Sequence, residues 1–198
     1  MNEHDRPEAG PRSLVGTACA HGIGTPPGRA DGTRRGPDLV PDGSAELCRT
    51  LPTPADTHEL GRRLGGVVEA GDLVVLAGPL GAGKTAFTQG IGAGLGVLGR
   101  VTSPTFVIAR LHRPAPDGRG TALVHVDAYR LGGIGELEDL DLGLDLDRAV
   151  VVVEWGEGLA ESLTDEHLLV RMDRRPDDTR EAVLTAAGPS WTRRLAAL

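Results

Sequence analysis

The sequence predicts an α/β sandwich whose central sheet has both parallel and antiparallel strand neighbours. From about residue 53 onward, short apolar runs of strand length alternate with helical patterns. Residues 73–77 (LVVLA) are apolar throughout, which is typical of a strand buried on both faces of a sheet. Residues 167–172 and 180–186 flank a turn-rich segment and therefore indicate an antiparallel hairpin.

The first helix is expected to begin at Thr53. The Thr53 hydroxyl can cap the helix, Pro54 suits its first turn, and Asp56 lies three residues after the cap. Apolar side chains then recur on one helical face until Gly71 and Asp72 break the pattern. The remaining predicted elements are a second helix over 85–95, strands at 106–112, 122–127 and 149–154, and a short helix from about residue 190.

Residues 1–52 are predicted to form a disordered tail, and residues 53–198 are predicted to form one domain. The first 50 residues contain 8 Gly and 6 Pro and no aromatic residue. Such a segment has too little apolar surface to offset the entropy lost when it is ordered. The residues after it are enough for a hydrophobic core of ordinary size.

Charge and patterning exclude several classes of protein. The net charge of −7 and the pI of about 5.3 leave no whole-chain cationic field, so we expect no binding to DNA or membranes and poor binding to free tRNA. The apolar runs are too short to span a membrane, and the N-terminal residues lack the order of a secretory signal. The six histidines show no metal-ligand spacing, and Cys19 and Cys48 indicate no disulfide framework. These observations predict a cytoplasmic protein.

Residues 78–85 (GPLGAGKT) match the phosphate-binding pattern G-x-x-x-x-G-K-[ST] and lie between a buried strand and a helix. This context predicts a P-loop NTPase three-layer sandwich with a mixed parallel and antiparallel sheet. Lys84, the only lysine in the chain, is expected to reach the β- and γ-phosphates, and the Thr85 hydroxyl is expected to bind Mg²⁺. The predicted nucleotide-binding residues of the loop are Gly78, Leu80, Gly81, Ala82, Gly83, Lys84, Thr85 and Ala86.

Two carboxylates end apolar strands at the place where parallel strands beside a phosphate loop emerge. Asp127 ends the predicted strand 122–127 and is a candidate for holding Mg²⁺ directly or through water. Glu154 ends the strand 149–154 in the same way. Either residue can instead cap the loop that follows. Ser103 and Thr105 flank a proline turn, and each is a candidate switch hydroxyl for Mg²⁺ or the γ-phosphate, or simply part of a turn that begins a strand.

Four motifs in this order and spacing resemble the TsaE (YjeE) family: GPLGAGKT at 78–85, SPTF at 103–106, HVDAYR at 125–130 and VEW at 153–155. The resemblance covers roughly residues 53–186. It implies a P-loop ATPase of the bacterial machinery that forms threonylcarbamoyladenosine next to the anticodon of tRNA. It also implies docking on a TsaD–TsaB heterodimer, with tRNA met only through that complex.

The resemblance also implies roles for individual residues. Lys84 and Thr85 would serve the phosphates and the metal, and Asp127 and Glu154 would be needed for ATP hydrolysis. We choose Glu154 as the carboxylate that organises the attacking water. The predicted catalytic residues are therefore Lys84, Asp127 and Glu154, and the predicted metal ligands are Thr85, Asp127 and Glu154.

Further members of the motifs have less direct roles. By the same resemblance Thr105 belongs to a switch segment, and Trp155 lies near the nucleotide. Pro79 departs from the family, which commonly has an acid there, and this affects only the entrance of the loop. Residues 136–147 alternate carboxylates with leucines, which is typical of a solvated face; the alternative is a partner surface.

Three other functions compete with the ATPase. A small-molecule kinase would need a mobile cationic lid, for which the sequence offers only scattered arginines at 110, 113 and 119. A GTP-dependent switch usually reads guanine with an N-K-x-D element, which requires a second lysine that this chain lacks. The lone lysine therefore favours ATP over GTP. A nucleotide sensor without turnover is the third alternative.

Overall fold

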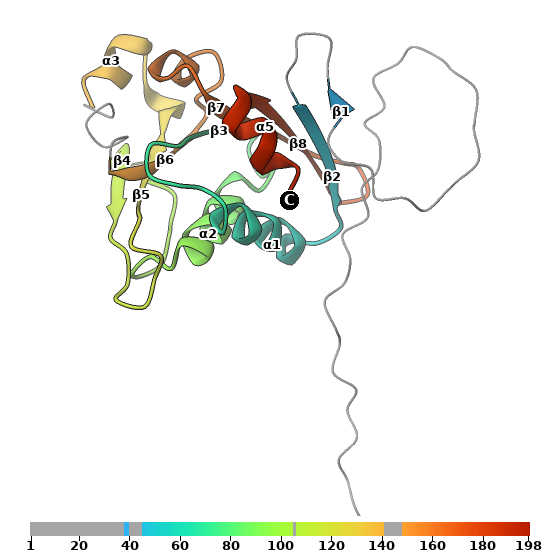
Figure 1. The fold of residues 1–198 in the computed structure, drawn as a ribbon. Coiled ribbons are helices and arrows are strands. Elements are labelled where there is room, and N and C mark those ends of the chain that lie inside the picture. Colours follow the sequence, from blue (N-terminus) through green and yellow to red (C-terminus); the bar gives the residue numbers. More distant parts are fainter. Residues whose placement is uncertain (1–37, 40–44, 105, 141–147) are drawn as a thin grey trace, which may run out of the picture.

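The structure, a computed structural model, describes residues 38–39, 45–104, 106–140 and 148–198. Within these residues eight strands form one sheet in the order β1-β2-β8-β7-β3-β6-β5-β4 (Figure 1). The strands are β1 (Asp38–Leu39), β2 (Ala45–Leu51), β3 (Leu73–Ala77), β4 (Ala109–His112), β5 (Ala122–Asp127), β6 (Ala149–Glu154), β7 (His167–Arg174) and β8 (Arg180–Ala187). The helices are α1 (Pro54–Gly65), α2 (Lys84–Leu95), α3 (Ile134–Glu138) and α5 (Pro189–Leu195), with 3₁₀ turns η1 (Ala128–Arg130) and η2 (Ala160–Leu163).

The sheet is parallel at its centre and antiparallel at both sides. Strand β3 runs parallel to both β7 and β6, and β6 runs parallel to β5. Strand β4 pairs antiparallel with β5 at one edge. At the other side β7, β8, β2 and β1 pair antiparallel in succession. The predicted mixed sheet is therefore confirmed.

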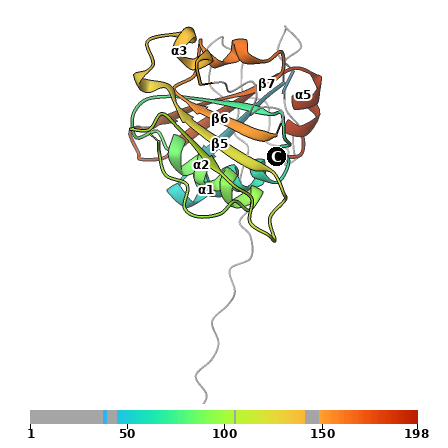
Figure 2. The same cartoon turned by 90° about the vertical axis from the view of Figure 1, so that its left-hand side faces the viewer.

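Two apolar clusters lie on the two faces of the sheet. One cluster joins alternate residues of β3, β5 and β6 to α1, α2 and α5 through side chains such as Phe87, Ile91 and Trp191. The other cluster joins the intervening residues of the same strands to the segments around α3 and η2. Figure 2 shows the sheet between α3 on one side and α1 with α2 on the other. This arrangement is the predicted three-layer sandwich.

The start of α1 agrees with the sequence prediction. The Thr53 side chain accepts from the Asp56 backbone N–H at 3.3 Å, and the Asp56 carboxylate accepts from the Thr53 backbone N–H at 2.8 Å. The two side chains thereby bond reciprocally to backbone N–H groups at the helix terminus. Helix α1 therefore has a fixed starting point next to β2.

The predicted boundary of the domain at residue 53 is wrong. Residues Ala45–Leu51 form strand β2, which pairs antiparallel with β8, and Ala45, Leu47 and Leu51 are buried in the core. The high Gly and Pro content of the first 50 residues concealed a short alternating segment at its end. Residues 1–37 and 40–44 lie outside the described residues, so their predicted disorder stays a prediction.

One smaller expectation also needs correction. The strand predicted at 106–112 begins only at Ala109, because the backbone N–H groups of Val107 and Ile108 both donate to the Pro104 carbonyl and form a turn instead.

Helices α1 and α2 pack closely through glycines. A Cβ added at Gly61 would overlap the Phe87 carbonyl, and one added at Gly90 would overlap the His58 carbonyl. Because such overlaps are with backbone atoms, they cannot be relieved by a side-chain rotation. The glycines therefore set the distance between the two helices, and α2 carries the phosphate-binding loop at its start.

We expect Gly90→Ala to destabilise the domain by about 1–3 kcal/mol, because the added methyl group forces the two helices apart. The matched control is Gly135→Ala in α3, where an added Cβ meets nothing within 4 Å. Urea unfolding measures both free energies. Equal free energies of unfolding for the two variants would contradict a glycine-dependent helix contact.

Candidate functional site

The predicted site residues meet at the carboxyl ends of the central parallel strands. Asp127 on β5 and Glu154 on β6 are register partners, and Glu154 is also the register partner of Leu76 on β3. The phosphate loop leaves the sheet directly after Ala77, the last residue of β3. Parallel strands in register end at one level, so this edge brings the loop and both carboxylates together.

The loop itself depends on glycines. Gly78, Gly81 and Gly83 have φ values of 127°, 82° and 108°, a region that residues with a Cβ rarely adopt. A Cβ at Gly78 would also overlap the Met172 carbonyl of β7. The loop can therefore turn tightly between the sheet and α2 only with glycine at these positions.

The N-terminus of α2 is arranged to receive an anion. Its N-cap, Gly83, has no side chain to cap the helix, and the first turn contains no acidic residue. The first intrahelical bond is donated by the Phe87 N–H to the Gly83 carbonyl, so the N–H groups of Lys84, Thr85 and Ala86 precede the helical pattern. These donors and the positive end of the helix dipole favour a phosphate group. Within the loop, the Ala82 N–H donates to the Pro79 carbonyl at 3.2 Å.

Lys84 lies inside the site rather than in solvent. Its ammonium donates to the Gly78 and Pro79 carbonyls at 2.6 and 3.0 Å and lies 3.6 Å from the centre of the Trp155 ring. Burial lowers the pKa of the Lys84 ammonium, and the carboxylates of Glu154 and Asp127 counteract this by raising it. An incoming phosphate would have to compete with the two loop carbonyls for the ammonium.

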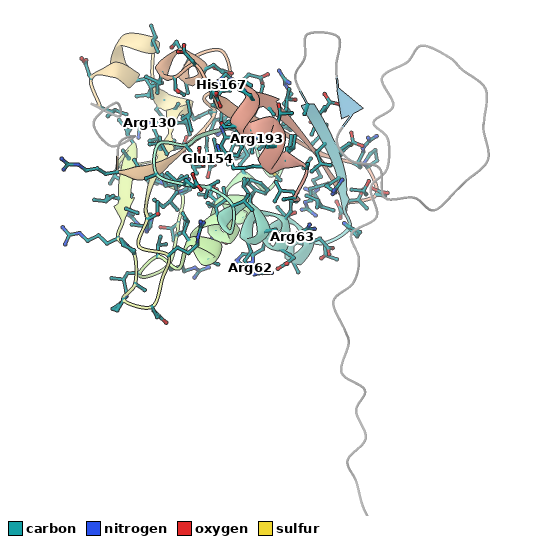
Figure 3. All side chains as sticks on the ribbon, in the orientation of Figure 1. Arg62, Arg63, Arg130, Glu154, His167 and Arg193 are labelled. Atoms are coloured by element: carbon teal, nitrogen blue, oxygen red, sulfur yellow. The ribbon has the colours of Figure 1, made fainter. Side chains whose placement is uncertain are left out.

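Glu154 is buried and connects three elements. Its carboxylate accepts from the Thr85 hydroxyl at 2.9 and 3.2 Å and is 2.8 Å from Nε2 of His125. Thr85 belongs to α2, His125 to β5 and Glu154 to β6. Figure 3 places the labelled Glu154 in the interior of the molecule, at the end of the β6 ribbon.

Asp127 is held by a second set of contacts. Its carboxylate accepts from the Ser103 hydroxyl at 3.1 Å and from the Tyr129 backbone N–H at 3.1 Å. Ser103 therefore faces the site. Thr105, the other predicted switch hydroxyl, lies outside the described residues, and its role stays a prediction.

Trp155 lies over the loop because of an unusual backbone conformation. Its φ is 62°, and its backbone N–H donates to the Leu76 carbonyl at 2.8 Å. This turn at the end of β6 directs the ring towards Lys84, and the Tyr129 ring lies 5.0 Å away from it. A non-glycine residue in this region is uncommon and often marks a functional position.

Thr85, Asp127 and Glu154 supply the kind of oxygen ligands that Mg²⁺ takes. In the described part of the chain, no group of three or more His, Cys, Asp or Glu residues is placed to hold a metal ion. Mg²⁺ usually keeps several waters and takes only one or two carboxylates plus nucleotide phosphates. The donor set therefore fits a metal that arrives with a nucleotide, not a resident structural ion.

Sequence reasoning named most of this site but missed His125 as a contact of Glu154. The two residues are 29 positions apart, and only the register of β5 against β6 brings them together. The motif 125–130 contained the histidine, but no local pattern identifies its partner. Leu80, one of the predicted nucleotide-binding residues, is 92% exposed.

The family model described as "Threonylcarbamoyl adenosine biosynthesis protein TsaE" matches residues 51–182 of this chain. The chain belongs to the TsaE family. A TsaE from Streptomyces coelicolor is 57% identical over 139 residues, which are 68% of this chain and 93% of that protein. A TsaE from Mycobacterium tuberculosis (strain H37Rv) is 52% identical over 159 residues, covering 77% of this chain and 94% of that protein. A TsaE from Bacillus subtilis is 39% identical over 138 residues, which are 68% of this chain and 82% of that protein.

The fold of this TsaE family member resembles a solved structure as well. The crystal structure of Bacillus subtilis YdiB superposes with a TM-score of 0.61 at 31% sequence identity. The match covers 76% of this chain and 92% of that chain. The sequence-based assignment to the TsaE family and its P-loop fold are therefore confirmed.

A cavity of about 610 Å³ lies elsewhere on this TsaE fold, at the amino ends of the strands. It is lined by Asp72 at the start of β3 and by Ser190, Arg193 and Arg194 of α5. Asp72 and Arg194 form an ion pair there. Because the phosphate loop leaves the opposite end of β3, this cavity does not belong to the predicted site.

We expect ATP with Mg²⁺ to change the fluorescence of Trp155, because binding of phosphate draws the Lys84 ammonium away from the ring. Trp155→Phe should remove this change. Trp191→Phe is the matched control, since Trp191 is a buried residue of α5 whose ring lies next to Arg194 instead. A nucleotide-dependent signal that survives in Trp155→Phe would contradict the arrangement.

Proposed function

We propose that this protein binds and hydrolyses ATP as its part in forming threonylcarbamoyladenosine in tRNA. Family membership supports the role in threonylcarbamoyladenosine biosynthesis. The observation that supports hydrolysis is the buried Glu154 carboxylate beside Thr85, at the start of the phosphate-loop helix. A carboxylate at this place can orient water toward a γ-phosphate.

In this proposal each residue acts from the edge of the sheet or the start of α2, with the Lys84 ammonium and the Thr85 hydroxyl exchanging their present partners for the nucleotide and its metal. Lys84 neutralises charge on the outer phosphates, and the N–H groups that begin α2 hold their oxygens. Thr85, with Asp127 or Glu154, would hold the Mg²⁺ that accompanies ATP, and the ion would supply positive charge to the outer phosphates. Glu154 positions the attacking water. The protein itself forms no covalent intermediate.

We further propose that the ATPase drives or resets a TsaD–TsaB heterodimer and meets tRNA only there. Three segments near the site carry exposed apolar side chains: Leu80 in the loop, Phe106 and Val107 before β4, and Tyr129 after β5. Leu80 and Phe106 are about nine-tenths exposed. Exposed apolar patches of this kind mark protein-binding surfaces. A partner that docks on this patch would also cover the nucleotide.

The cytoplasm is the proposed location. No helix in the described ranges is long and apolar enough to cross a membrane.

Two of the three arginines that the cationic lid of a kinase would need, Arg110 and Arg119, make contacts within the chain. Arg119 donates to the carbonyls of Gly65 and Val68, at the end of α1. Arg110 donates to the Thr102 hydroxyl at 2.9 Å. Both guanidinium groups are engaged in structural contacts, so the ATPase is the better-supported function.

We expect Glu154→Gln to lower the ATPase rate by about 100-fold or more while ATP still binds, because water positioning is lost and the phosphate contacts remain. Lys84→Ala should weaken ATP binding itself. Glu157→Gln is the matched control, because Glu157 is exposed and pairs with Arg171 at 2.6 Å. Phosphate release and equilibrium nucleotide binding are measured separately. Full ATP turnover in Glu154→Gln would refute the role assigned to Glu154. If the protein were only a nucleotide sensor, Glu154→Gln would lose ATP turnover but keep its biological activity.

We also expect a purified TsaD–TsaB pair to stimulate the ATPase, and Phe106→Ser to reduce that stimulation without changing the basal rate. Phe106→Ser removes an apolar contact with the partner but lies outside the phosphate site, so the basal rate is unaffected. Leu98→Ser serves as the control, since Leu98 is an exposed apolar residue too, at 53% exposure, but lies after the far end of α2. Identical stimulation of both variants would place the docking surface elsewhere.

A further inference from the structure

A fully buried histidine contacts the carboxylate of Glu154 from the neighbouring strand. His125 on β5 has no exposed surface, and its Nε2 lies 2.8 Å from Oε1 of Glu154. Its other ring nitrogen, Nδ1, is buried and has no hydrogen-bond partner among the described residues. The one hydrogen bond that orients this ring is therefore the bond that it donates to Glu154.

This contact differs from the other contact of Glu154 in what it can do during turnover. The Thr85 hydroxyl also donates to Glu154, but the proposed function requires Thr85 to turn toward Mg²⁺. His125 has no such second task, because it lies two residues before the end of β5 and its Nε2 already contacts Glu154. The imidazole is thus a donor that remains when Thr85 is engaged by the metal.

The sheet makes this donor rigid. Strands β5 and β6 are parallel and in register from Ala122 with Ala149 to Asp127 with Glu154. His125 and Asp127 are two residues apart on one strand, so both face α2 with Glu154. A glutamate side chain has three rotatable bonds, and a fixed donor restricts the positions its carboxylate can take.

We propose that His125 is a positioning residue that holds the Glu154 carboxylate in the orientation needed for hydrolysis. This proposal rests on the proposed ATPase function and assigns no contact between His125 and the nucleotide. A purely structural role for the pair predicts a different outcome, because replacing a buried polar pair often changes stability without a specific effect on turnover.

The test compares His125→Leu, which removes the donor, with His125→Gln, whose side-chain amide places an N–H near the position of Nε2. In the full chain, His125→Leu should lower kcat for ATP about 10- to 100-fold, as loss of an outer hydrogen-bond partner typically does. The KM for ATP and the affinity for ATP should change little. His125→Gln should recover most of the lost kcat.

His112→Leu is the matched control. His112 on β4 is also a buried histidine, and its Nε2 has no partner among the described residues, so its loss removes an imidazole but not the hydrogen bond to Glu154. We expect this variant to keep kcat. In a Glu154→Gln background, adding His125→Leu should cause little further loss of kcat, because the two side chains act together.

The outcomes separate the two proposals. If the wild-type protein does not hydrolyse ATP with or without TsaD and TsaB, the proposed function fails and this inference fails with it. If the wild type is active and His125→Leu keeps its kcat, only the inference fails. The positioning role is also overturned if His125→Leu and His112→Leu lose kcat and thermal stability equally and His125→Gln recovers no kcat.

Discussion

The buried carboxylate of Glu154 is the constraint on which the site depends. A carboxylate removed from water is costly unless donors surround it, and here the donors come from the phosphate-loop helix and from a neighbouring strand. Satisfying this one group therefore fixes α2 against β5 and β6. The same contacts place the start of α2 beside Asp127 and Trp155, so the position of the carboxylate determines the geometry of the whole edge.

Elements with strong local signals could be predicted from the sequence. The cap at Thr53, the glycine-rich loop and the continuous apolar strands at 73–77 and 149–154 are determined by residues close together in the chain. Strand β2 was missed because its alternation is short and lies next to a Gly- and Pro-rich segment. The turn before Ala109 was missed because it depends on bonds from two N–H groups to one carbonyl, which no pattern of apolar residues reveals.

The same limit applies to the site. Lys84, Thr85 and the two strand-end carboxylates were identified because a loop motif and the ends of apolar runs are visible in the sequence. The contacts between Glu154 and His125, and between Asp127 and Ser103, depend on strand register and on the path of a loop. Such contacts follow from tertiary structure, so residue spacing alone cannot assign them.

The glycine contact between α1 and α2 has a consequence for the stability of the phosphate-binding end of α2. Helix α2 contains Gly90, Gly92 and Gly94, and each glycine in a helix interior costs about 1 kcal/mol relative to alanine. Helix α2 is thus a poor helix by itself and gains its stability from docking on α1. The phosphate-binding terminus forms only when the two helices are docked, so nucleotide binding and helix docking are thermodynamically linked. Nucleotide would accordingly protect the amides of α1, although α1 holds none of the predicted ligands.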